Sequence, residues 1–139
     1  KNTSDDRYAT LFYAVYDSDA KTLTYTNAGH LAPFFVSEGR VQALDQGGTV
    51  VGLFEDYPYA QCTIEVTPGS LLVAFSDGLT EPESVYGEEF GVERLKAEVL
   101  RQRDMPVGTL AESLIAAAEQ WSGTPEQADD MTVVVARMR

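Results

Sequence analysis

Five consecutive apolar residues, Leu71 to Phe75, constrain the fold more than any other stretch of this 139-residue chain. A Pro-Gly pair precedes the run and a glycine follows it shortly afterwards, so the pattern predicts a strand that is buried on both faces. The chain continues directly into Ser76, Asp77 and Gly78. A carboxylate at the end of a buried strand costs free energy unless something neutralises it. Asp77 is therefore the first residue at which we expect chemistry.

A second apolar strand pattern, residues 131–136, directly follows Asp129 and Asp130. If the two strands share a sheet, their acidic ends can meet, and meeting carboxylates repel unless a cation lies between them. Oxygen ligands without His or Cys suit Mg²⁺ or Mn²⁺ better than zinc. Each motif alone is weak evidence, because Asp-Gly is a common turn and Asp often precedes a strand. Together, Asp77 and Asp129 predict a metal site.

Gly78 and the other polar candidates have more than one explanation. Gly78 allows a close approach of the backbone to an ion or a phosphate, or a turn with positive φ. The single histidine, His30, is explained by a tight turn in which Asn27 and Gly29 take left-handed conformations. Ser76 lacks the flanking glycines of a nucleophile elbow, so we expect it to pack or to support its acidic neighbour. Without a side-chain nucleophile, a metal-activated water fits the acidic pair.

The charge balance restricts the partners. Ten basic against 22 acidic residues give a formal net charge of −12. This disfavours nucleic acid and an anionic membrane surface, both of which bind basic patches. No run of about 18 apolar residues occurs, so we expect no membrane span, and a cytoplasmic location is the default. The single cysteine, Cys62, excludes an internal disulfide and a cysteine metal cluster and fits a packed strand thiol.

Strand patterns dominate the first half of the chain. Residues 8–16 are rich in aromatic and β-branched side chains and predict a strand, buried on both faces at Leu11 to Val15. Residues 22–26 alternate in polarity and predict its hairpin partner. A glycine pair at 47–48 predicts a flexible link. Three further strands are predicted at residues 34–36, 41–44 and 62–66.

Helix patterns appear only after the central strand. Apolar residues at helical spacing predict an amphipathic helix over residues 92–103, which Pro106 ends. Thr109 and Glu112 fit a capping box at the start of a second helix, which Gly123 ends. Four glutamates between the central strand and the first helix predict a solvated acidic loop.

The last strand pattern, residues 131–138, returns after the helices. We expect it to lie beside an earlier strand, which would bring Asp129 to Asp77. This order predicts an α+β fold with a largely antiparallel sheet and helices on one face. We expect one domain over residues 1–139. Because the chain begins with Lys1 rather than Met, we expect it to be a piece of a longer protein.

Five short motifs occur in a familiar order. They are Asn27-Ala28-Gly29-His30, Pro68-Gly69-Ser70-Leu71-Leu72, Ser76-Asp77-Gly78-Leu79-Thr80-Glu81, Phe90-Gly91-Val92-Glu93-Arg94-Leu95 and Asp129-Asp130-Met131-Thr132. Together they resemble the metal-dependent serine/threonine phosphatases of the PPM (type 2C) family, in the bacterial SpoIIE/RsbU-like branch. The resemblance runs from about Tyr8 to the C-terminus.

The resemblance implies a β-sandwich of mainly antiparallel strands flanked by helices, with a two-metal Mn²⁺ or Mg²⁺ site between the sheets. It implies that a metal-activated water attacks phosphoserine or phosphothreonine directly. Asp77 and Asp129 match the family's catalytic, metal-binding aspartates. Asp130 is assigned to the same metal site as a neighbouring group, and Gly78 places backbone near the metal. The implied substrate is a phosphorylated anti-sigma-factor antagonist, and an upstream sensor domain often regulates such phosphatases.

One family segment has no match in residues 1–26. Family members carry an N-terminal Asp-x-x-Gly-type segment that supplies another aspartate, whereas Asp5 and Asp6 lack the following glycine. We therefore expect the chain to hold the C-terminal portion of a phosphatase domain, with weak or absent activity by itself. Exposed sheet edges and apolar faces should result. A second copy of the chain, as in a homodimer, or another part of the parent protein would cover them.

Two functions remain open on the sequence. The first is a protein serine/threonine phosphatase, which the aspartates favour. The second is a non-catalytic regulatory interaction module of the same fold, which the missing N-terminal aspartate favours for this chain. A metal titration separates them, because substitution of Asp77 should weaken a metal site and leave a scaffold unaffected.

Overall fold

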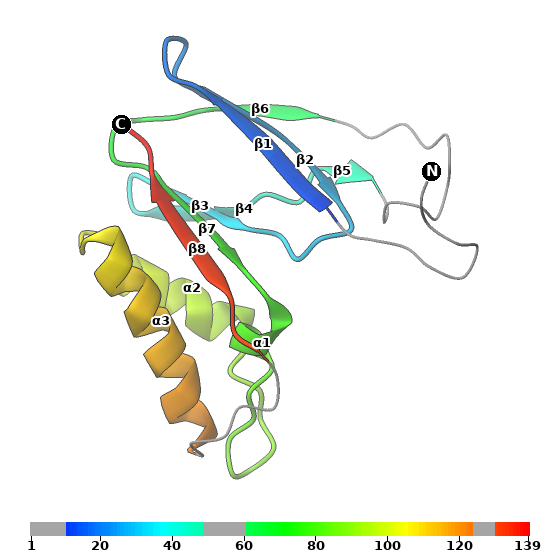
Figure 1. The fold of residues 1–139 in the computed structure, drawn as a ribbon, viewed down its shortest axis with the longest axis vertical. Coiled ribbons are helices and arrows are strands. Elements are labelled where there is room, and N and C mark those ends of the chain that lie inside the picture. The colour runs from blue at the N-terminus through cyan, green and yellow to red at the C-terminus, as the bar shows by residue number, and fades with distance from the viewer. Residues whose placement is uncertain (1–10, 49–60, 124–129) are drawn as a thin grey trace.

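The computed structural model describes residues 11–48, 61–123 and 130–139, in which two β-sheets stack and helices cover one of them (Figure 1). This is the α+β sandwich that the sequence predicts. In chain order the elements are β1 (Leu11–Asp17), β2 (Thr22–Ala28), β3 (Phe34–Ser37), β4 (Arg40–Ala43), β5 (Gly47–Gly48), β6 (Cys62–Glu65), β7 (Leu71–Phe75), α1 (Asp77–Thr80), α2 (Gly91–Arg101), α3 (Val107–Ser122) and β8 (Val133–Arg137).

The first sheet is built around β2. The predicted hairpin of β1 and β2 is confirmed, and its turn is held by the Asp17 carboxylate, which accepts from the backbone N–H groups of Asp19 and Ala20 at 3.0 Å each. Strand β6 pairs with β2 antiparallel, and β5 pairs with it in parallel. The glycine pair is thus a short strand rather than the predicted flexible link. The buried Asn27 N–H of β2 needs a hydrogen-bond partner, and it donates to the Gln46 carbonyl at 2.8 Å. This bond holds the glycine pair beside β2.

The second sheet has the strand order β4-β3-β7-β8. Strand β8 returns after the helices and pairs with β7 antiparallel, with Phe75 opposite Val133. The expected insertion of the last strand beside an earlier one is therefore confirmed. Because the pairing is antiparallel, the chain entering β8 lies beside the chain leaving β7.

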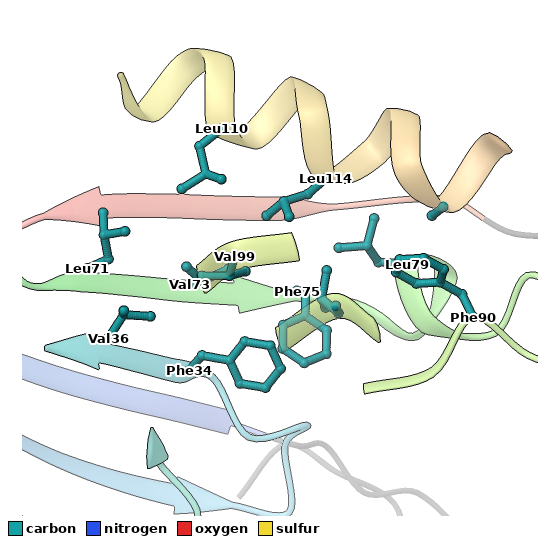
Figure 2. Packing of buried hydrophobic residues seen from close by; sticks show 12 residues of the cluster. Phe34, Val36, Leu71, Val73, Phe75, Leu79, Phe90, Val99, Leu110 and Leu114 are labelled. Carbon is teal, nitrogen blue, oxygen red and sulfur yellow. The ribbon is translucent and has the colours of Figure 1, made fainter. Parts of the chain in front are cut away.

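Two apolar cores hold the layers together. Figure 2 shows the larger core, in which Leu110 and Leu114 of α3 project toward the side chains of β7 and β3. Within it the rings of Phe34 and Phe75 pack with centroids 4.9 Å apart. The second core lies between the sheets and contains Leu23, Tyr25, Phe35, Leu44, Val66 and Met138. Cys62 packs against this second core, as expected of a strand thiol.

The expectation that β1 is buried on both faces is wrong. Leu11, Tyr13 and Val15 are 49%, 60% and 50% exposed, whereas the alternate residues Phe12 and Ala14 pack into the core between the sheets. Strand β1 pairs only with β2 among the described elements, and the helices lie against the other sheet (Figure 1). Its apolar outer face is therefore left without a cover within the described ranges.

The helix boundaries differ in part from the predictions. Helix α3 begins at Val107, so Thr109 and Glu112 do not form the predicted capping box; Pro106 precedes the helix, and its carbonyl accepts from the Leu110 N–H at 2.9 Å. A proline suits the first turn because it needs no N–H partner there. The predicted helix end at Gly123 is confirmed, with φ of 67°. None of the helices that the structure describes is long and apolar enough to cross a membrane.

Candidate active site

Asp77 lies where the buried strand β7 ends. Phe75 is the last buried residue of the strand, and the chain then turns into the short helix α1, which begins at Asp77 and was not predicted. Leu79 of α1 is fully buried and fixes this turn against the helical core. The Asp77 side chain is exposed, and no group in the described ranges donates a hydrogen bond to its carboxylate. The carboxylate is therefore accessible to a cation from solvent.

Ser76 connects this turn to the segment that enters β8. Its backbone N–H donates to the Thr132 carbonyl at 3.0 Å, and its Oγ accepts from the Thr132 N–H at 3.0 Å. The same hydroxyl donates to the Asp130 carbonyl at 3.5 Å, a weak contact. Ser76 thus supports the acidic segment through these contacts, as the sequence predicts for this residue.

Gly78 allows the two segments to approach closely. A Cβ atom at this position would overlap the Asp130 carbonyl oxygen and carbon. Gly78 does not have a positive φ angle. A glycine is therefore needed here because the Asp130 backbone leaves no room for a Cβ atom, and not because of a left-handed turn. Of the two explanations that the sequence left open, the turn with positive φ is wrong, and approach to an ion or a phosphate stays a prediction. The group that the structure places against Gly78 is the Asp130 backbone, which the sequence did not suggest.

The second predicted aspartate pair is only partly described. Asp130 is exposed and its backbone lies against Ser76 and Gly78. Asp129 lies outside the described residues, so its predicted meeting with Asp77 stays a prediction. The structure nevertheless brings the neighbouring residue, Asp130, to the turn that carries Asp77.

The histidine turn lies at the same edge of the sandwich. A cavity of about 530 Å³ is lined by Gly29, His30, Leu31, Ala32, Phe75, Ser76 and Asp77. Asn27 holds the turn, since its Oδ1 accepts from the His30 N–H at 2.8 Å and its Nδ2 donates to the Leu44 carbonyl at 3.0 Å. Gly29 has the predicted positive φ, 74°, whereas Asn27 lies in extended strand β2. The predicted tight turn is thus confirmed, whereas the left-handed conformation expected of Asn27 is wrong, because Asn27 holds the turn through its side chain.

The position of His30 beside Asp77 was missed by sequence reasoning. Both motifs follow a strand, but the two strands belong to different sheets. Which strand ends share an edge depends on how the sheets stack, and no local pattern encodes that. His30 Nδ1 lies 2.8 Å from the Leu31 carbonyl, which can only accept, so Nδ1 is the donor in this contact.

The donors at this edge suit a hard divalent cation in kind. The Asp77 carboxylate lies in the cavity lining and Asp130 lies beside Gly78, while His30 is the one nitrogen ligand and no cysteine is among the lining residues. Across the described ranges, however, no three His, Cys, Asp or Glu side chains cluster closely enough to hold an ion. The donor chemistry therefore fits Mg²⁺ or Mn²⁺, and a complete ligand set requires residues beyond those described.

A second cavity, of about 440 Å³, lies at the opposite end of β7 beside Ser70 and Leu71. Arg137 fills its wall and donates to the carbonyls of Gly69, Arg103 and Met105 at 3.2, 2.9 and 2.8 Å. These contacts tie β8 to the turn before β7 and to the loop between α2 and α3. Because the guanidinium is engaged by backbone carbonyls, we interpret this cavity as part of the scaffold.

Comparisons with known proteins agree with this architecture. A family model described as Stage II sporulation protein E (SpoIIE) matches residues 1–139, the whole chain. The phosphoserine phosphatase RsbU of Bacillus subtilis (strain 168) is 36% identical over 83 residues, which cover 58% of this chain and 25% of RsbU.

Solved structures share the fold at low identity. The SiaA-PP2C domain of Pseudomonas aeruginosa superposes with a TM-score of 0.79 at 22% identity, over 94% of this chain and 52% of that one. The phosphatase domain of SpoIIE from Bacillus subtilis, presoaked with Mn, superposes with a TM-score of 0.72 at 20% identity, over 94% of this chain and 56% of that one. The chain thus spans a quarter of RsbU and about half of each solved domain, and the predicted PP2C-type fold is confirmed.

Proposed function

The chain belongs to the SpoIIE family, and from this membership we propose that it forms part of the catalytic domain of a metal-dependent protein serine/threonine phosphatase. Over residues 1–139 we propose a single, partial domain. One observation carries the proposal. The pairing of β7 with β8 joins the Asp77 turn to the Asp130 segment at the edge of the sandwich that also holds the cavity.

We assign the metal ligands to the acidic ends of the two strands. Asp77 and Asp129 are proposed as the catalytic, metal-binding carboxylates, with Asp130 beside them and the backbone of Gly78 near the metal. The accessible Asp77 carboxylate and the close approach at Gly78 support this assignment. The ions are proposed to be Mn²⁺ or Mg²⁺, which the oxygen donors suit and which the Mn-presoaked SpoIIE relative supports.

A divalent ion bound here would lower the pKa of a coordinated water and polarise a phosphoryl oxygen. The contribution of the chain itself is positional. Ser76 fixes the acidic segment through its three contacts with Asp130 and Thr132. The absence of a Cβ at Gly78 keeps that segment close to Asp77. His30 and its turn bound the cavity in which a phosphoryl group would lie.

The substrate is proposed to be a phosphoserine or phosphothreonine protein. The name of RsbU, a phosphoserine phosphatase, supports this class. Within it we propose a phosphorylated anti-sigma-factor antagonist, under the control of an upstream sensor domain. Because the chain spans about half of the solved domains, the activity is proposed for the parent protein, with weak or absent turnover by this chain alone.

Phosphate release tests the proposal directly. The parent protein should release phosphate from a phosphoserine peptide in Mn²⁺ and not in EDTA, and Asp77→Asn should lower kcat by at least about 100-fold, the scale of electrostatic catalytic groups. Glu65→Gln, which removes an exposed carboxylate from β6 opposite Thr22, is the matched control and should keep the rate. Equal Mn²⁺-dependent rates for the parent protein and its Asp77→Asn variant would contradict the assignment.

The alternative is a non-catalytic regulatory module of the same fold. It is favoured by the lack of a three-ligand metal cluster among the residues that the structure describes. Under this alternative the parent protein binds its partner without Mn²⁺, and the Asp77→Asn variant binds equally well. Metal-dependent turnover by the parent protein would exclude it.

A further inference from the structure

Residues 82–90, which we call the acidic hairpin, form a small ordered loop between α1 and α2. The Ser84 N–H donates to the Glu88 carbonyl at 2.8 Å, and the Phe90 N–H donates to the Pro82 carbonyl at 2.8 Å. The Ser84 Oγ accepts from the Tyr86 N–H at 3.2 Å. The sequence predicts only a solvated acidic loop here, but these bonds give the loop a defined shape.

Both long helices hold the base of the acidic hairpin. Trp121 of α3 donates from Nε1 to the Glu88 carbonyl at 2.7 Å. Arg94 of α2 donates to the carbonyls of Glu89 and Phe90 at 3.0 Å each and lies 3.9 Å from the centroid of the Trp121 ring. A loop held this way loses little conformational entropy when it binds a partner.

The tip of the acidic hairpin carries two apolar side chains into solvent. Val85 is 83% exposed and Tyr86 is 94% exposed, more than any other large apolar residue in the described ranges. A flexible loop can expose such residues without consequence, but a fixed loop presents them permanently. Rigid tyrosines surrounded by polar groups are typical anchors of protein interfaces.

The charge around the tip has one sign. Glu83, Glu88 and Glu89 are all exposed, and Arg94, the cation at the base, is engaged with Glu88 at 3.1 Å. A partner that buries Val85 and Tyr86 therefore meets an acidic rim. Complementary charge requires lysine or arginine around the apolar pocket of that partner.

The acidic hairpin is also close to the proposed active site. Val85 follows Asp77 by eight residues, so the two lie at most about 29 Å apart, the length of that segment when fully extended. Figure 1 shows the loop projecting beyond α1, at the end of the sandwich where β7 finishes. The acidic hairpin and the proposed active site therefore lie at the same end of the molecule, where one folded protein can contact both.

We propose that the acidic hairpin docks the phosphoprotein substrate. Val85 and Tyr86 enter an apolar pocket ringed by lysine and arginine on that protein, while its phosphorylated side chain reaches the cavity beside Asp77. The inference rests on the proposed phosphatase function and adds to it the chemistry of the docking surface. It makes Val85 and Tyr86 determinants of specificity, without contact to the reacting atoms.

The test compares a small and a large substrate in the parent protein. The small substrate is p-nitrophenyl phosphate, and the large ones are phosphorylated linker histone, a basic protein with a folded domain, and phosphorylated casein, an acidic protein. The first variant, Val85→Ser/Tyr86→Ser, removes the apolar tip, and the second, Glu83→Lys/Glu89→Lys, inverts the rim. Met105→Ser/Val107→Ser is the matched control, since it removes two exposed apolar side chains at the other end of the helices, one from the loop after α2 and one from the first residue of α3.

The proposal predicts a selective loss. Removal of the tip should raise KM for phosphohistone about tenfold, the scale of a single interface anchor, and should leave kcat/KM for p-nitrophenyl phosphate unchanged. Inversion of the rim should shift the preference from phosphohistone to phosphocasein. Equal losses on the small and the large substrates, or an unchanged KM for phosphohistone, would overturn it.

A binding measurement separates this inference from the proposed function. Fluorescence anisotropy of labelled phosphohistone reports docking without turnover. Absence of all hydrolysis, together with an affinity that falls about tenfold in the tip variant, would refute the phosphatase activity and leave the docking surface standing. An affinity that is the same in the parent protein and the tip variant would refute the docking surface, whatever the activity.

Discussion

At Gly78 the lack of a side chain, more than charge, allows the Asp77 turn and the Asp130 segment to lie in contact. Because a Cβ there would overlap the Asp130 backbone, we predict that Gly78→Ala destabilises the chain. The expected loss is about 1–3 kcal/mol, the usual cost of overpacking. Urea denaturation followed by circular dichroism measures it.

Gly108 provides the control for this substitution. It lies in α3 with open space around its missing Cβ. Gly108→Ala should therefore be neutral or stabilise the helix by up to about 1 kcal/mol. A Gly78→Ala variant as stable as Gly108→Ala would show that the two segments do not approach as the structure has them.

At the scale of single residues, the sequence predicts which residues are candidates for the site better than it predicts which residues lie beside them in space. Asp77 is predicted from local pattern alone, because an apolar run that stops at a carboxylate is visible in one window. The role of Gly78 is left as two alternatives, because the approaching group, Asp130, lies far away in sequence. The proximity of His30 to Asp77 is missed for the same reason, since it depends on the stacking of two sheets.

The C-terminal end of α2 contains a carboxylate with a shifted pKa. Glu98 accepts from Arg101 at 2.6 Å and from Gln102 at 2.7 Å. The hydrogen bond from Arg101, more than that from Gln102, lowers the pKa of Glu98 below its ordinary value of 4.5, against the opposing effect of burial. The ionised Glu98 carboxylate is therefore more stable in the folded state than in the unfolded state.

We predict a pH-dependent stability contribution from this helix end. A lowered folded pKa gives stability that is present above the ordinary pKa of 4.5 and lost as the pH falls through the folded value. Glu98→Gln should cost a few tenths of a kcal/mol at pH 7, the scale of partly exposed ion pairs, and progressively less below about pH 4.5. Thermal melts of both proteins at pH 7 and pH 3 measure this. A difference that stays constant or grows toward low pH would contradict the prediction.

Strand and helix predictions succeed where packing follows local pattern. Strand β7 and the end of α3 at Gly123 appear where they are predicted, because an apolar run and a left-handed cap are encoded locally. The second face of β7, with Leu72 and Ala74, is half-buried rather than buried. The burial of β1 is predicted wrongly. Its apolar residues predict a strand, but they do not indicate whether another element of the chain packs against its outer face. The start of α3 is also missed. A proline such as Pro106 can stop a preceding helix or stand directly before the next one, and the sequence does not distinguish these two roles.

The exposed face of β1 predicts the behaviour of the chain as a whole. Leu11, Tyr13 and Val15 form an apolar stripe on the side away from the helices. Contiguous exposed apolar surface promotes association, so the chain alone should self-associate at micromolar concentration. Leu11→Ser/Val15→Ser should shift it toward monomer, as light scattering after size-exclusion chromatography would show.

The control for association is Val134→Ser. Val134 is 58% exposed on β8, in the other sheet. This substitution should leave the association unchanged. A chain that is monomeric with its β1 stripe intact, or one that responds equally to both sets of substitutions, would show that the β1 face is not the associating surface.

The central claim is that the two acidic strand ends share divalent ions. A double-mutant cycle of Mn²⁺ affinity in the parent protein tests it, with Asp77→Asn, Asp129→Asn and the double variant measured by calorimetry. The account predicts that each single substitution weakens Mn²⁺ binding about tenfold or more, and that the double variant loses less than the sum, with a coupling of at least about 1 kcal/mol. Unchanged affinity in the single variants, or strictly additive losses, would contradict it.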